Sequence, residues 1–111
     1  MKRKEKRGSK KAESVIQSGD RFERNPDVVH RRMKEDVVLL PVRPIRETER
    51  QFYFCEEVGG RIWELLDGRR RCQGIVETIA SEFGENQGRI RSDVLVFLKD
   101  LEREGLIRRV R

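Results

Sequence analysis

The chain has 111 residues, of which 35% are hydrophobic and 41% are charged, and its formal net charge is +6. This length fits one domain, and the low apolar content predicts a small, helix-rich core beside a disordered segment. No apolar run is long enough for a signal peptide or a membrane span, so we expect neither and infer a cytoplasmic protein.

The positive charge is concentrated at the start of the chain. Residues 1–24 contain nine Lys and Arg against four acids, whereas residues 25–111 contain 17 basic and 16 acidic residues. Residues 1–24 are therefore predicted to be a disordered basic tail, either an electrostatic arm for nucleic acid or an acidic partner, or a solubilising extension. Residues 25–111 are predicted to form the folded domain.

Three short apolar segments are typical of strands. A turn signal at residues 25–27 precedes segments 28–33 and 37–42, which a polar hairpin turn separates. The segment 37–42 is the most apolar, so we expect it at the centre of a sheet until Pro41 ends its pairing. The segment 51–55 has three aromatic residues among five. The three segments together predict an antiparallel meander.

Apolar residues then recur at helical spacing. One helix is expected from residue 57 to the glycine at 68, a second from about 73 to 84, and a third from 86 or 92 to 105. Residues 69–71 are expected to connect the first two helices, and residues 106–110 to form a final extended segment. Strands followed by helices predict an α+β, winged-helix-like domain.

Two glycines interrupt the first predicted helix. Gly59 and Gly60 each cost about 1 kcal/mol relative to alanine in a helix interior. Their presence in the first turns indicates close packing of this helix against the sheet.

The sequence offers no catalytic or metal-binding constellation. Cys55 and Cys72 are too far apart for a Cys-x-x-Cys site, and His30 is the only histidine. We therefore expect two buried thiols, a surface histidine, and neither a metal nor another cofactor. A small enzyme is disfavoured because a nucleophile-base pair, a phosphate loop and spaced carboxylates are lacking.

Several motifs follow one another from the first predicted helix onward: Gly-x-x-Ile-Trp-x-Leu-Leu-Asp-Gly at residues 59–68, a helix, Asp-x-x-x-Phe-Leu at 93–98 and Gly-Leu-Ile at 105–107. With this order of motifs the chain resembles the PqqD family. The resemblance covers about residues 26–110. Glu56 and Arg71 depart from the Asn and Thr that are usual in the family.

PqqD is the small protein of pyrroloquinoline quinone biosynthesis, and its relatives recognise ribosomally made, post-translationally modified peptides. The resemblance implies a non-catalytic module that binds the leader segment of a precursor peptide and delivers it to a modifying enzyme such as a radical-SAM maturase. The leader would lie antiparallel along the third strand, between that strand and the third helix. This agrees with the open strand edge that the aromatic segment predicts.

The predicted peptide site combines the aromatic strand with one side of the third helix. The basic residues Arg91, Lys99 and Arg103 of that helix are candidates to pair with acidic leader residues. Which strand face lines the groove stays open, because a shift of one residue reverses the faces. The predicted peptide-binding residues are Gln51, Phe52, Tyr53, Phe54, Cys55, Arg91, Leu95, Leu98 and Lys99.

Two other binding classes remain as alternatives. A winged-helix nucleic-acid binder would read DNA with the third helix, but residues 91–104 carry three basic and four acidic residues, whereas such a helix needs a basic surplus. Edge-to-edge pairing of two copies through the third strand would need no peptide. We expect a monomer or a weak dimer.

Overall fold

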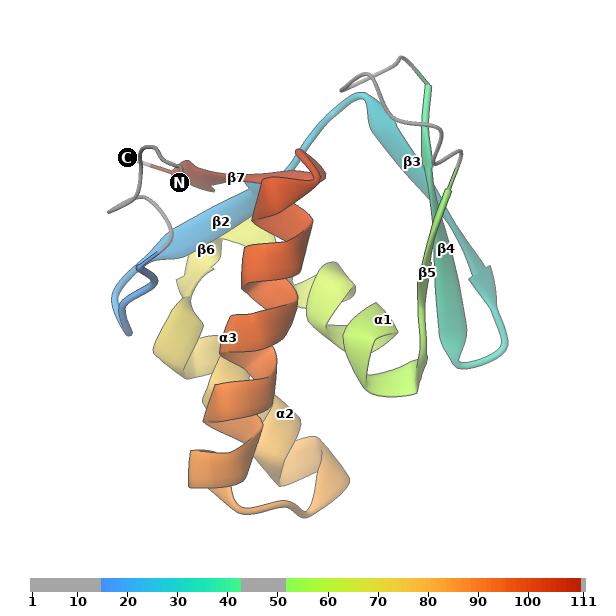
Figure 1. Cartoon of the computed structure of the whole chain (residues 1–111). Helices are drawn as coiled ribbons and strands as arrows, with labels where there is room; N and C mark the ends of the chain where they lie inside the picture. Colours follow the sequence, from blue (N-terminus) through green and yellow to red (C-terminus); the bar gives the residue numbers. More distant parts are fainter. Residues whose placement is uncertain (1–14, 43–51, 111) are drawn as a thin grey trace, which may run out of the picture.

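Two three-stranded antiparallel sheets and three helices make up residues 15–42 and 52–110, the part of the chain that the computed structural model describes (Figure 1). This is the predicted α+β, winged-helix-like class. In chain order the elements are β2 (Arg21–Arg24), β3 (Val28–Met33), β4 (Asp36–Pro41), β5 (Tyr53–Cys55), α1 (Glu57–Leu65), β6 (Asp67–Arg71), α2 (Cys72–Phe83), α3 (Gln87–Arg103) and β7 (Ile107–Val110).

The predicted meander is confirmed as the sheet β3-β4-β5, with β4 at its centre. Val37 lies opposite Cys55, and the side chains of Val37 and Leu39 are fully buried. Because side chains alternate along a strand, these residues define the inner face of the sheet, which packs on α1. Val38 and its partner Phe54 lie on the outer face.

The second sheet, β6-β2-β7, joins segments that are far apart in the sequence. Its central strand β2 carries Phe22, which is only 1% exposed, and Ile16 just before it is also buried. The prediction of disorder through residue 24 is therefore wrong for residues 15–24, while residues 1–14 lie outside the described part. The expected connector at 69–71 is also wrong, because it belongs to β6.

The helices have the predicted order and close bounds. The side chain of Asn86 caps α3 by accepting hydrogen bonds from the N–H groups of Gly88 and Arg89, and Gly84 ends α2 in the left-handed conformation, with φ of 65°. The first helix ends differently from the prediction, since α1 stops at Leu65 and left-handed Gly68 lies within β6.

Close packing of α1 on the meander, which the glycine pair predicts, is confirmed. A Cβ atom on Gly60 would lie 2.9 Å from Cγ2 of Val37 on β4. A side chain here would therefore push the helix away from the sheet.

The core is centred on Trp63 of α1, which is fully buried. His30 on β3 meets its indole edge to face at 6.2 Å between ring centroids, and the Arg24 guanidinium lies 5.9 Å from the ring centroid. His30 is otherwise exposed, as predicted for a surface residue. No helix within the described residues is long and apolar enough to cross a membrane.

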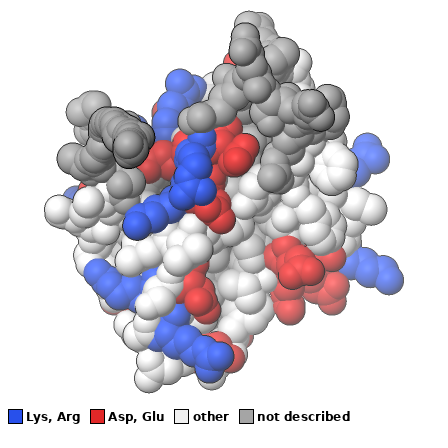
Figure 2. All heavy atoms as spheres, in the orientation of Figure 1, with Lys and Arg blue, Asp and Glu red and all other residues white. Residues whose placement is uncertain are grey.

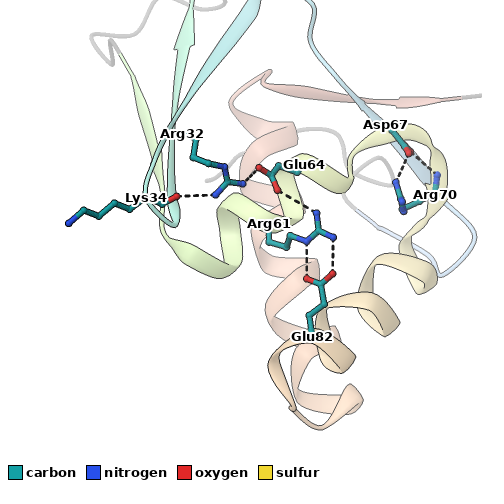
Figure 3. Close-up of polar contacts among 7 residues, drawn as sticks. All are labelled: Arg32, Lys34, Arg61, Glu64, Asp67, Arg70 and Glu82. Atoms are coloured by element: carbon teal, nitrogen blue, oxygen red, sulfur yellow. Dashed lines mark hydrogen bonds and ion pairs between the residues drawn. The ribbon is translucent and has the colours of Figure 1, made fainter.

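A chain of ion pairs ties the β3-β4 hairpin to the helices (Figure 3). Arg32 on β3 pairs with Glu64 of α1, and Arg61 of α1 reaches both Glu64, at 3.4 Å, and Glu82 of α2. The Arg61–Glu82 contact is bidentate, at 2.8 and 2.7 Å, and this hydrogen bonding raises the pKa of Arg61 and lowers that of Glu82. The network holds the hairpin, α1 and α2 in one arrangement.

Candidate functional site: a groove beside an open strand edge

The outer edge of β5 is open within the described part of the chain. β5 pairs with β4 along one edge, and no described strand pairs with its other edge. A strand edge presents N–H and C=O groups that another extended segment can complete. The position of β5 therefore meets the first requirement of a peptide site.

A groove of about 560 Å³ follows this edge. Its walls are β5, the turn into α1 and the ring of Phe97, which projects from α3. Val58 and Gly59 of α1 form part of its lining. The groove thus lies between the third strand of the meander and the third helix, as the family resemblance implies.

A second hollow of about 480 Å³ adjoins the first and shares Val58, Gly59 and Phe97 with it. Its lining is mostly apolar and comes from all three helices, including Ile62 of α1, Phe83 of α2, and Ile90 and Val94 of α3. The two hollows adjoin at these shared residues and extend from the edge of β5 toward the α2-α3 turn, and together they are called the groove below. Such a surface suits an extended segment with large apolar side chains.

Gly59 sets the width of the groove where the two hollows meet. A Cβ atom at this position would lie 3.1 Å from Cζ of Phe97 and 3.5 Å from Cβ of Cys55. Glycine therefore allows α1 and α3 to approach closely while the aromatic ring stays in its place.

Residues from both faces of β5 line the groove, since Tyr53 and Phe54 both belong to its lining. Tyr53 is partly buried and packs against the core, whereas Phe54 is 48% exposed. Phe52 is 54% exposed and does not line either hollow. Cys55 is fully buried beneath Gly59, so only its backbone lies at the edge. Gln51, the remaining predicted strand residue, lies outside the described residues.

The predicted residues of α3 lie on other sides of that helix. The Arg91 guanidinium bonds to Ser18 and, at 2.6 Å, to Gln73, both away from the groove. Leu98 is fully buried, Leu95 packs on the core, and Lys99 is exposed without lining either hollow. The structure therefore assigns these four residues no contact with the groove.

The helical residues that do line the groove include Asp93 and Phe97 of α3. Neither residue is among the predicted site residues, because a phase error of about one residue rotates a helix by roughly 100°, which exchanges neighbouring faces. Asp93 and Phe97 are spaced i, i+4, and the same spacing carries the family motif. That motif was the signal available in the sequence.

The thiols do not add reactive chemistry to the groove. Both cysteines are free and buried, as predicted, and burial raises the pKa of the Cys55 thiol to about 12. Burial also raises the pKa of Cys72. Neither group provides a thiolate at neutral pH. The described residues contain no cluster of His, Cys, Asp and Glu that could hold a metal ion.

The fold and the groove together define a winged-helix-like binding domain with an open strand edge. Residues 36–107 match the family model of coenzyme PQQ synthesis protein D, and the chain belongs to this PqqD family. No curated protein matches the sequence.

Two solved structures share this fold. TbiB1, determined in complex with the TbiA(beta) leader peptide, is 27% identical and has a TM-score of 0.65, with 77% of this chain and 93% of TbiB1 covered. The PqqD part of PqqCD from Methylobacterium extorquens, described as a stand-alone recognition element for ribosomally synthesised and post-translationally modified peptides, is 16% identical. Its TM-score is 0.67, with 86% of this chain and 96% of that chain covered.

Proposed function

We propose that this chain is a non-catalytic recognition module for the leader segment of a ribosomal precursor peptide. The leader adds to the open edge of β5 as an antiparallel strand, and its apolar side chains enter the groove against Phe97. The observation that carries this proposal is the coincidence of an open edge and an apolar groove at one place. Membership of the PqqD family and the leader peptide bound to TbiB1 support it.

The module is proposed to hand the bound peptide to a separate modifying enzyme, such as a radical-SAM maturase. The described lining of the groove consists of apolar groups, four carboxylates, the Arg89 guanidinium, Tyr53 and the buried Cys55. A binding role needs no more than these groups, whereas nucleophilic catalysis would need a nucleophile activated by a base.

The strand edge and the apolar groove contribute differently to the free energy of peptide binding. A backbone hydrogen bond contributes about 0.5–1.5 kcal/mol net, whereas association costs roughly 4–15 kcal/mol. Pairing with the three residues of β5 cannot offset that cost alone. Apolar anchors at about 1.5–3 kcal/mol each must supply the remainder. The strand edge therefore orients the peptide, and the groove retains it.

Backbone-modified peptides test strand addition directly. Binders selected from a random-peptide display library are resynthesised with one N-methyl group at each successive backbone amide, and affinity is measured by calorimetry. Strand addition predicts losses at alternate residues only, because alternate N–H groups point toward β5. Uniform losses or none contradict strand addition.

A neighbouring pair of protein variants tests the location. Tyr53→Asp places a charge in the groove and should abolish binding, whereas Phe52→Asp, on the outer face, should leave the affinity within about threefold. Equal losses in both variants would place the peptide elsewhere. Sedimentation without peptide distinguishes a third outcome, in which two copies pair edge to edge.

A further inference from the structure

The lining of the groove has a charge opposite to that of the whole chain. The chain carries +6, yet the groove is lined by four carboxylates and one guanidinium, a net charge of −3. The charged lining residues are Glu56, Glu57, Glu85, Asp93 and Arg89.

The carboxylates lie on both sides of the apolar floor. Glu56 and Glu57 stand at the turn from β5 into α1, and Asp93 stands on α3, one turn before Phe97. Glu85 follows the end of α2. Figure 2 shows acidic side chains gathered beside the start of α1, and others along α3 with Lys and Arg side chains among them, while mostly uncharged side chains lie in between.

These carboxylates are not neutralised by the described part of the chain. All four residues are exposed, and none forms an ion pair with a described residue. Of the α3 cations, only Arg89 belongs to the lining in the described residues, and it is already counted in the net charge of −3. Arg91 bonds to Ser18, and Arg103 pairs with Asp100 at 3.0 Å. Within the described residues, the groove therefore presents a net negative charge to a guest.

We propose, building on the proposed function, that the peptide segment recognised by this chain is basic and carries Lys or Arg beside its apolar anchors. Long cationic side chains can lay their aliphatic stems along Val58 and Phe97 while their charged ends reach the rim carboxylates. This replaces the expectation that acidic leader residues pair with Arg91 and Lys99, which lie off the groove. An acidic segment would place like charges beside one another.

The test begins with random-peptide display on the whole chain, followed by calorimetry on the selected sequences and on matched Lys→Glu and Lys→Gln peptides. We expect enrichment of Lys and Arg next to large apolar residues. Replacing two such lysines by glutamate should weaken binding about tenfold, because two exposed ion pairs are lost and repulsion replaces them. Higher ionic strength should reduce this difference.

Charge reversal in the protein locates the effect. The double variant Glu57→Lys, Asp93→Lys should reverse the preference and bind the Lys→Glu peptides more tightly than the parent peptides. Glu77→Lys, on an exposed part of α2 outside both hollows, is the matched control and should preserve the original preference. Since all three positions are exposed, the variants should retain the thermal unfolding temperature of the parent chain.

The outcomes separate the two proposals. If peptides bind by strand addition but are acidic or neutral, or if Lys→Glu leaves the affinity unchanged, the basic-segment inference is overturned and the proposed function stands. A reversal of preference in Glu77→Lys as well would also overturn it, because net charge and not the groove would then decide. If no selected peptide depends on Tyr53, both proposals fail.

Discussion

The two sheets of this domain are completed in different ways. The sheet β6-β2-β7 joins residues from three distant parts of the chain and is bordered by ion pairs of its own, including Arg70–Asp67 at 2.6 Å and Arg109–Glu102 at 2.8 Å. The sheet β3-β4-β5 is built from consecutive strands, and the described residues leave one edge of β5 open.

The two sheets also differ in how many hydrophobic side chains they expose. Of the eight large hydrophobic side chains that are exposed in the described residues, six belong to the meander or directly flank it. They are Val29, Met33, Leu40, Val42, Phe52 and Phe54. The difference teaches that the sheet β6-β2-β7 acts mainly as a support, whereas the meander carries most of the exposed hydrophobic side chains and is the sheet available for partners.

The largest expected effect tests whether the supporting sheet β6-β2-β7 is needed for the stability of the fold. Phe22→Ala should lower the free energy of unfolding by about 3–5 kcal/mol, because a fully buried aromatic side chain is removed from the core. Urea unfolding followed by circular dichroism measures it. Glu23→Ala, the exposed neighbour, should change stability by no more than about 0.5 kcal/mol. Similar midpoints for Phe22→Ala and the parent would show that β2 is peripheral.

The next effect concerns the inner face of the meander and its pH dependence. Burial raises the pKa of Cys55 from 9.0 to about 12, so the folded state retains a proton that the unfolded state releases. The stability that this thiol contributes is therefore constant below pH 9 and falls as pH rises, by about 1.4 kcal/mol per unit and roughly 4 kcal/mol by pH 12. Urea titrations of the parent chain and of Cys55→Ala should diverge in slope above pH 9. Parallel curves would mean that the thiol is solvated in the folded state.

The meander and the helices could be predicted from the sequence because each depends on local pattern. The short apolar segments 28–33 and 37–42 with the turn between them, and the apolar repeats of α2 and α3, are properties of neighbouring residues. The supporting sheet could not be predicted in this way. Phe22 stands alone among charges, and only pairing with β6 and β7, more than 40 residues away, gives it a place in the core.

The site was predicted unevenly for a related reason. The strand was placed correctly, but the face it presents and the face of α3 that meets it depend on phase. Leu98 and Phe97 are adjacent in sequence, yet one is core and the other lines the groove. Apolar character alone cannot separate them, because both are large hydrophobic residues at positions compatible with an amphipathic helix.

A smaller effect is expected at the point where α1 and α3 approach each other beside the sheet β3-β4-β5. Gly59→Ala adds a Cβ atom 3.1 Å from the Phe97 ring, which must move into the groove or away from it. We expect peptide affinity to fall about tenfold, or about 1.4 kcal/mol. Gly74→Ala is the matched control, since its Cβ would meet nothing within 4 Å, and it should stabilise α2 by up to about 1 kcal/mol without changing affinity. Equal affinity in both variants would show that the guest does not pass this point.

The smallest expected effect concerns the ion pairs that join the open sheet to the helices. Arg61→Ala removes the contacts to Glu64 and Glu82, but these side chains are 28–38% exposed, so the loss in stability should be no more than about 1 kcal/mol. The network lies apart from the lining of both hollows, so peptide affinity should stay unchanged if the hairpin, α1 and α2 keep their arrangement without Arg61. If the free energy of peptide binding falls by more than the free energy of unfolding, these ion pairs instead set the position of β5 relative to Phe97. Calorimetry and thermal unfolding on the same preparation distinguish the two, because weakened folding moves the unfolding temperature and an altered groove moves the dissociation constant.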